Sequence, residues 1–162
     1  MKTSQLNRRV SLGLAIPAFA LMSTALAQED EIVGTWNCSM SAEQEGMTMS
    51  MEFERIFEAD GTTEIDGKMS ISAPQASLEA SMLIVANGTW SAESMVLTEK
   101  MTDGTVKSAS ETPSQLEQMF VAQMQAEFSE NAQEEQTTIT ALTETTMELE
   151  SGGMPLKCER AA

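Results

Sequence analysis

The fold is decided by the stretch MTMSMEFERIF, residues 47–57. Apolar and polar residues alternate along it, which is typical of a strand with one buried face. Directly after it, Ala59-Asp60-Gly61 is a turn signal of the hairpin type. The stretch therefore predicts a long strand that enters an antiparallel hairpin. Six residues are expected on its inward face: Met47, Met49, Met51, Phe53, Arg55 and Phe57.

The same alternation recurs on both sides of this stretch. We expect further strands at residues 32–41, 63–71, 77–86, 95–100, 105–110, 135–142, 145–150 and 154–160. Strands and helices do not alternate, so a parallel sheet is not expected. The pattern predicts a mainly β protein, an antiparallel β-barrel or strongly curved sheet of about eight or nine strands.

One segment changes period. Apolar residues from Leu116 to Phe128 recur at helical spacing and form a stripe. Ser114 and Glu117 match a capping box, and Pro113 ends the preceding strand. We predict an amphipathic α-helix near 114–130 that covers an opening or a face of the sheet.

The first 27 residues have the layout of an export signal. A basic start with Lys2, Arg8 and Arg9 precedes an apolar run that ends in Ala25-Leu26-Ala27. This arrangement predicts a Sec-type signal peptide, residues 1–27, cleaved after Ala27. A retained membrane anchor and twin-arginine export at Arg8-Arg9 are the alternatives. Cleavage leaves residues 28–162 as one periplasmic or secreted domain with no membrane span.

Charge and composition exclude several functions. The chain has 25 acidic and 9 basic residues, no histidine and a formal charge of −16. Removing residues 1–27 leaves 25 acids against 6 bases, a charge of −19. Without histidine there is no Ser-His-Asp triad and no His-ligated metal site. Such a chain does not seek nucleic acid or anionic lipid by charge, but it suits a cationic partner.

The two cysteines, Cys38 and Cys158, lie near the two ends of the expected domain. In an exported protein an even cysteine count indicates a disulfide, which would tie the first and last strands together. A reactive thiol or a metal thiolate pair is the alternative, although neither cysteine has a CxxC partner or a nearby base.

Three short motifs carry a resemblance. They are Gly34-Thr35-Trp36, Phe57-x-x-Asp60-Gly61-Thr62 and Gly88-Thr89-Trp90. Together they make residues 28–162 similar to the small lipocalin-like (calycin-type) domains of bacterial secreted proteins. The resemblance implies that Trp36 packs across the closed end of a barrel, that Gly34 allows close backbone approach there, and that Trp90 is structural.

Methionine is unusually frequent, and Met47, Met49 and Met51 share one strand face. Flexible methionines fill cores that are short of aromatic residues, and they also line adaptable cavities. Thioethers are Cu(I) ligands as well, but no histidine or cysteine lies nearby to complete such a site. We therefore expect no metal and no other cofactor.

Arg55 is the one charged residue on this inward face. A buried guanidinium needs a partner. Arg55 could pair with an internal carboxylate, receive the acidic head of a ligand, or reach water near the strand end.

Carboxylate pairs occur at Glu52/Glu54, Glu134/Glu135 and Glu148/Glu150. Such spacing could support glycosidase-like acid and base residues, but the alternation points these pairs to solvent. The acidic segment 60–67 lacks the EF-hand pattern of a calcium loop. We expect no catalytic residues and no enzymatic activity.

Two functions follow from these observations. The first is non-enzymatic binding of a small apolar or amphipathic ligand in the barrel interior, with the six inward residues of 47–57 as its wall. The alternative is an envelope interaction or inhibitor protein whose acidic surface binds a cationic partner.

Overall fold

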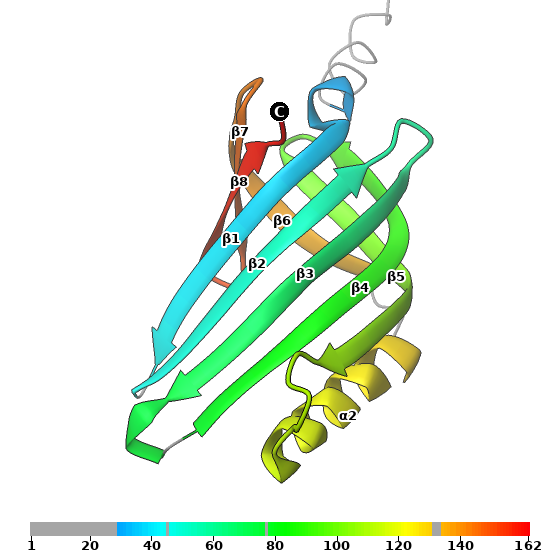
Figure 1. Ribbon diagram of the computed structural model, residues 1–162. Helices are drawn as coiled ribbons and strands as arrows, with labels where there is room; N and C mark the ends of the chain where they lie inside the picture. Colours follow the sequence, from blue (N-terminus) through cyan, green and yellow to red (C-terminus); the bar gives the residue numbers. More distant parts are fainter. Residues whose placement is uncertain (1–28, 45, 77, 131–133) are drawn as a thin grey trace, which may run out of the picture.

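Eight antiparallel strands, joined in sequence order, close into a β-barrel in the computed structural model (Figure 1). The structure describes residues 29–44, 46–76, 78–130 and 134–162, so the expected leader, residues 1–27, lies outside the described residues. The predicted antiparallel barrel is confirmed. Its strands are β1 (Gly34–Gln44), β2 (Met47–Phe57), β3 (Thr62–Ala73), β4 (Leu78–Glu93), β5 (Val96–Ser108), β6 (Glu134–Leu142), β7 (Thr146–Ser151) and β8 (Met154–Arg160).

The barrel has two unlike halves. β1 pairs with β8 over Trp36–Ser39, and β5 pairs with β6 over Val96–Lys100. Beyond these two short ladders, β1 to β5 continue as a long curved sheet. Helix α2 (Gln115–Glu130) packs mainly against β5 at this end (Figure 1). One half is thus closed by all eight strands, and the other, which we call the open half, is a five-stranded sheet covered by the helix.

Tryptophan side chains occupy the core of the closed half. Trp36 is fully buried, and its Nε1 donates a hydrogen bond to the Ile32 carbonyl at 2.7 Å. Trp90 meets the ring of Phe57 edge-on, with 5.0 Å between the ring centroids. These residues share one apolar cluster with residues from β5 to β8, including Leu97, Ile139, Met147 and Leu149. The first and last strands therefore close around a common core.

The Arg160 side chain, and not backbone as expected, closely approaches Gly34. The φ of Gly34 is +131°, and a Cβ atom there would lie 2.5 Å from Nη1 of Arg160 on β8. The Arg160 guanidinium stacks 4.2 Å from the centroid of the Trp36 ring and donates to the Val33 carbonyl at 2.7 Å. A side chain at position 34 would displace this arginine, which explains glycine here.

The disulfide between Cys38 and Cys158 is present, as predicted. The two cysteines are direct partners in the β1–β8 ladder, so the bond crosses the seam where the barrel closes. It encloses a loop with a sequence separation of 120 residues. On the chain-entropy account, such a loop closure stabilises the fold by about 4–5 kcal/mol.

Two expectations about the strands, one strand end and one break between strands, are wrong. We expected a strand to stop at Ala86, and a break between residues 95–100 and 105–110. Instead β4 and β5 are single long strands whose register shifts beside Asn87 and Gly88. A Cβ atom at Gly88 would lie 2.4 Å from the Lys100 carbonyl oxygen. The Asn-Gly pair therefore marks a β-bulge at which two backbones approach closely. An Asn-Gly pair is also typical of a turn, so the sequence does not distinguish the two.

Helix α2 begins where it was predicted. The Ser114 hydroxyl accepts a hydrogen bond from the Glu117 backbone N–H at 3.1 Å, so Ser114 is the N-cap. Glu117 does not return to Ser114 to complete the capping box. Its side chain is buried and accepts a hydrogen bond from the Ser108 hydroxyl at 2.5 Å. This bond ties the first turn of the helix to the end of β5.

The apolar stripe of α2 is only partly as predicted. Phe120, Met124 and Phe128 pack against the sheet together with Val121. Leu116 and Met119, in contrast, are 39% and 62% exposed. Leu116 and Met119 thus lie outside the core, although Glu117 between them is buried.

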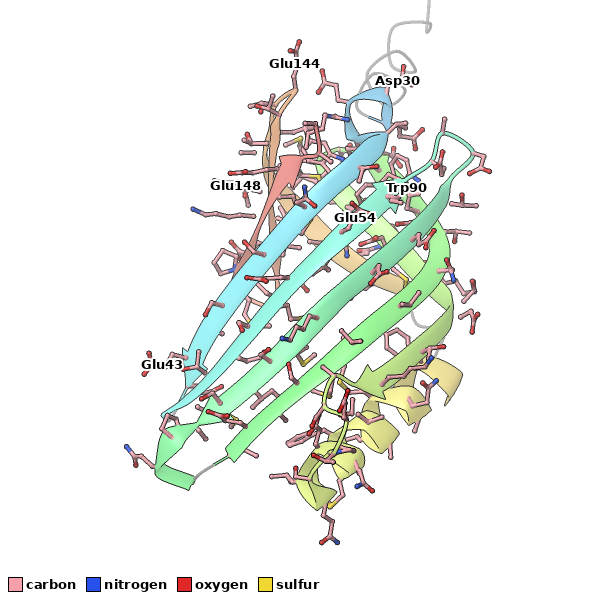
Figure 2. All side chains as sticks on the ribbon, in the orientation of Figure 1. Asp30, Glu43, Glu54, Trp90, Glu144 and Glu148 are labelled. Carbon is pink, nitrogen blue, oxygen red and sulfur yellow. A yellow bond between two sulfur atoms is a disulfide. The ribbon has the colours of Figure 1, made fainter. Side chains whose placement is uncertain are left out.

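Exposed acidic residues are spread over the outer surface. The carboxylates labelled in Figure 2, Asp30, Glu43, Glu54, Glu144 and Glu148, lie on different elements and are all exposed. No helix in the described part of the chain is long and apolar enough to cross a membrane.

Candidate functional site

The six inward residues lie along β2, which runs from the open half to the closed half. Met47 lies at the rim and is 43% exposed, whereas Met49 and Met51 pack against the apolar cluster of the open half. Phe57, at the other end, is part of the closed-half core. An interior cavity between these regions is lined by Met51, Phe53 and Arg55. The structure thus brings three of the six predicted residues to one cavity and places the other three elsewhere.

This cavity has a volume of 240 Å³ and lies between the sheet and α2. Its walls are mostly apolar, and its polar residues are Arg55, Glu99 and Glu135. Because Glu135 is exposed, the cavity reaches the protein surface on that side. The remaining lining residues come from five elements and are Met51, Phe53, Ile65, Ile84, Ala86, Met101, Met124 and Phe128.

Arg55 and Glu99 form a buried ion pair at the cavity. Arg55 Nη1 lies 3.2 Å from Glu99 Oε2, and the two side chains are 10% and 6% exposed. The guanidinium carbon is also 5.3 Å from the centroid of the Phe53 ring and 5.6 Å from that of Phe57. Of the alternatives that the sequence left open for Arg55, pairing with an internal carboxylate is the one observed.

The ion pair is not fully satisfied. Arg55 Nε and Glu99 Oε1 are buried, and neither has a hydrogen-bond partner among the described residues. A buried donor or acceptor without a partner costs about 1–3 kcal/mol. The ion pair that lines the cavity therefore keeps one donor and one acceptor without a partner.

Burial raises the pKa of the Glu99 carboxyl above its usual value. The Arg55 guanidinium acts in the opposite direction, and the negative charge of Glu135 raises the pKa further. Glu135 is the direct partner of Glu99 in the β5–β6 ladder. The polar end of the cavity thus combines one guanidinium with two carboxylates.

Glu99 was not identified from the sequence, although a signal existed. Leu97 and Glu99 are two residues apart on one strand, so alternation places them on the same face. Leu97 is fully buried, and Glu99 follows it into the interior.

Methionines from neighbouring strands line up in the open half. Met40, Met51, Met69 and Met82 are successive register partners across β1, β2, β3 and β4. Met69 and Met82 are buried among Ile71, Ile84 and Val106. The methionine face predicted on β2 is therefore part of a wider methionine row that packs into the core of the open half and borders the cavity.

Helix α2 contributes Met124 and Phe128 to the cavity wall. Gln125, between them, holds the helix to β5. Its amide donates to the Gly104 carbonyl at 2.9 Å and accepts from the Val106 N–H at 2.8 Å. Sequence reasoning missed Gln125 because a polar residue within a helix gives no sign that it meets a strand edge.

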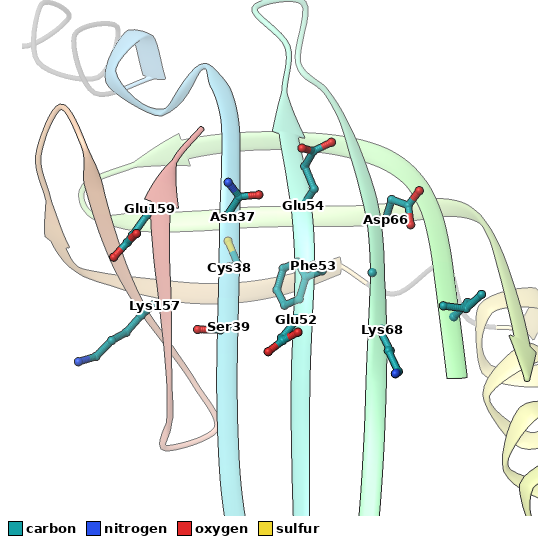
Figure 3. A pocket seen from close by; sticks show the side chains of 12 residues that line it. Asn37, Cys38, Ser39, Glu52, Phe53, Glu54, Asp66, Lys68, Lys157 and Glu159 are labelled. Carbon is teal, nitrogen blue, oxygen red and sulfur yellow. The ribbon is translucent and has the colours of Figure 1, made fainter. Parts of the chain in front are cut away.

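A larger hollow lies on the outside of the barrel, across β8, β1, β2, β3 and β4 (Figure 3). It has a volume of 720 Å³. Its charged residues are four carboxylates and two lysines: Glu52, Glu54, Asp66, Glu159, Lys68 and Lys157. A net charge of −2 is a small share of the chain's −16, so this hollow does not gather the acidic charge into one docking face.

The fold is lipocalin-like: eight antiparallel strands close in sequence order, and a Gly-x-Trp motif on the first strand packs into the closed end. No protein-family model matches the chain, and no curated protein matches it. Among solved structures, the chain is similar to the crystal structure of a lipocalin-like protein from Bacteroides uniformis ATCC 8492. The TM-score is 0.44 and the identity 11%, over 81% of this chain and 99% of that chain.

Proposed function

We propose that this protein is an exported, non-enzymatic binding protein that takes a small apolar or amphipathic molecule into its barrel. The observation that carries the proposal is the 240 Å³ interior cavity, whose walls are apolar and whose polar groups are gathered at an ion pair. Ligand sites are typically concave and mostly apolar, with a few placed polar groups. Export is supported by the signal layout of residues 1–27 and by the disulfide.

The walls suit ligands of variable shape. Met51, Met101 and Met124 line the cavity, and thioether side chains adapt to different apolar surfaces. Phe53 and Phe128 add rigid aromatic area. The volume lies below the roughly 300–1,000 Å³ of sites for drug-sized ligands, so a small molecule is expected.

Two measurements test the proposal. Native mass spectrometry of gently purified protein should show a bound small molecule. The melting temperature should also rise with at least one member of a panel of eight-carbon alcohol, amide, amine and carboxylate. Protein that is consistently bare and that no panel member stabilises would overturn the proposal.

A cavity-filling variant makes the test specific. Ala86 is buried and lines the cavity. Ala86→Leu should therefore abolish binding, because the larger side chain would occupy the cavity. Val85→Leu is the matched control, because Val85 precedes it on β4 and is 39% exposed. Binding that survives Ala86→Leu in a folded protein would place the ligand elsewhere.

A further inference from the structure

The polar end of the cavity defines the headgroup that fits it. Arg55 Nε–H can donate one hydrogen bond, and Glu99 Oε1 can accept one. Both belong to side chains that are at least nine-tenths buried, so water satisfies them poorly. A ligand group that bonds both atoms would remove two unsatisfied contacts at once.

Charge argues against an anionic headgroup. The positive charge of Arg55 is already matched by Glu99, 3.2 Å away. Glu135 lies opposite Glu99 in the ladder and adds a second carboxylate to the lining. A carboxylate ligand would have to compete with Glu99 for Arg55 while facing two like charges.

A cationic headgroup also fits poorly. An ammonium group only donates hydrogen bonds, so it would leave Arg55 Nε–H without an acceptor. It would also meet the positive guanidinium. A hydroxyl or amide group, in contrast, can both accept from Arg55 and donate to Glu99.

We infer that the cavity selects an uncharged amphipathic ligand, such as a medium-chain alcohol or amide, whose head accepts from Arg55 Nε and donates to Glu99 Oε1. This inference rests on the proposed function. The cavity volume of 240 Å³ sets the length of the tail, and an eight-carbon chain is a suitable probe.

Isothermal titration at neutral pH with octan-1-ol, octanamide, octanoate and octylammonium tests the inference on the unmodified protein. These compounds share a chain and differ in the head. The alcohol and the amide should bind about tenfold or more tightly than octanoate, because only they satisfy both free atoms. Octanoate or octylammonium binding as tightly as the alcohol would overturn the inference and leave the proposed function standing. Failure of all four to bind would count against the proposed function itself.

Glu99→Gln provides a second test. The variant removes one negative charge and leaves Arg55 unneutralised, so octanoate should gain about tenfold in affinity relative to octan-1-ol. Glu52→Gln, an equal charge change at an exposed position on β2, should leave the ranking as it is. A ranking that is the same in folded Glu99→Gln and in the unmodified protein would overturn the inference. The ranking on the unmodified protein decides the matter where the variant does not fold.

Discussion

The ring of Phe128 on α2 fills the space in front of Gly104 on β5. A Cβ atom on residue 104 would lie 2.6 Å from Cδ1 of Phe128, closer than van der Waals contact allows. Gln125 bonds the backbone of the same strand segment, beyond the part of β5 that pairs with β6. The glycine and the glutamine together set how closely the helix sits over the open half.

Gly104→Ala should therefore destabilise the fold, although alanine is otherwise at least as good as glycine in a strand. The added methyl group pushes against a rigid ring, which typically costs about 1–3 kcal/mol. The free energy of unfolding in urea measures the loss. In a Phe128→Ala background the same change should cost little, because the ring is gone. Additive effects of the two substitutions would contradict the contact.

Phe120→Asp should lower the free energy of unfolding by several kcal/mol, roughly 2–4, because Phe120 packs on the apolar cluster of the open half. Met119→Asp is the matched control on the neighbouring position. Met119 is 62% exposed, so its replacement should change stability by no more than about 0.5 kcal/mol. Equal losses in the two variants, measured by urea unfolding, would mean that the helix is oriented differently.

Replacing both Cys38 and Cys158 with serine should cost about 4–5 kcal/mol of unfolding free energy, because the loop of the unfolded chain is then no longer closed. The unmodified protein, denatured without reductant, should not react with a thiol reagent. Labelling under those conditions would contradict the bridge.

Glu99 should make stability fall as pH rises. Its folded pKa is raised above the usual 4.5, so between the two values the folded state holds the proton that the unfolded state has released. Unfolding free energy therefore decreases from pH 4.5 up to the folded pKa and is fully reduced above it. Comparing urea unfolding of the unmodified protein and Glu99→Gln across pH measures the contribution of the Glu99 carboxyl. A difference between them that does not change with pH would contradict the raised pKa.

Asp60 should affect the pH dependence of stability in the opposite direction to Glu99. Hydrogen bonds from the Thr62 side chain and backbone lower the pKa of Asp60 below 3.8. Its contribution is present above that value and is lost as pH falls through the lowered folded pKa. In urea unfolding across pH, Asp60→Asn should therefore be less stable than the unmodified protein by an amount that is constant well above pH 3.8 and shrinks as pH falls through the folded pKa. A difference that grows toward acid pH would contradict the lowered pKa.

The strands were predictable where the signal is local. Residues 47–57 alternate except at Arg55 and Ile56, and β2 has these bounds in the structure. The break expected after Ala86 was wrong because Asn-Gly is compatible with both a turn and a bulge. Choosing between them requires the register of β5, which lies outside that segment.

The candidate site was predictable only in part for the same reason. The inward position of Arg55 follows from alternation alone, but its partner Glu99 lies on another strand. The six residues of β2 look equivalent in sequence, yet they extend from an exposed rim to a closed core. Their distance from the cavity depends on where the barrel closes.

By itself the sequence determined the two-residue period of the strands, the capped start of α2, the pairing of its two cysteines and the motifs of the closed end. These signals act through backbone geometry within a few residues, or through the chemistry of a single pair. Only the tertiary structure decided that Arg55 meets Glu99, that Phe128 seats on Gly104 and that a cavity remains between sheet and helix. Such contacts depend on strand register and on the closure of the barrel, which join residues far apart in the chain.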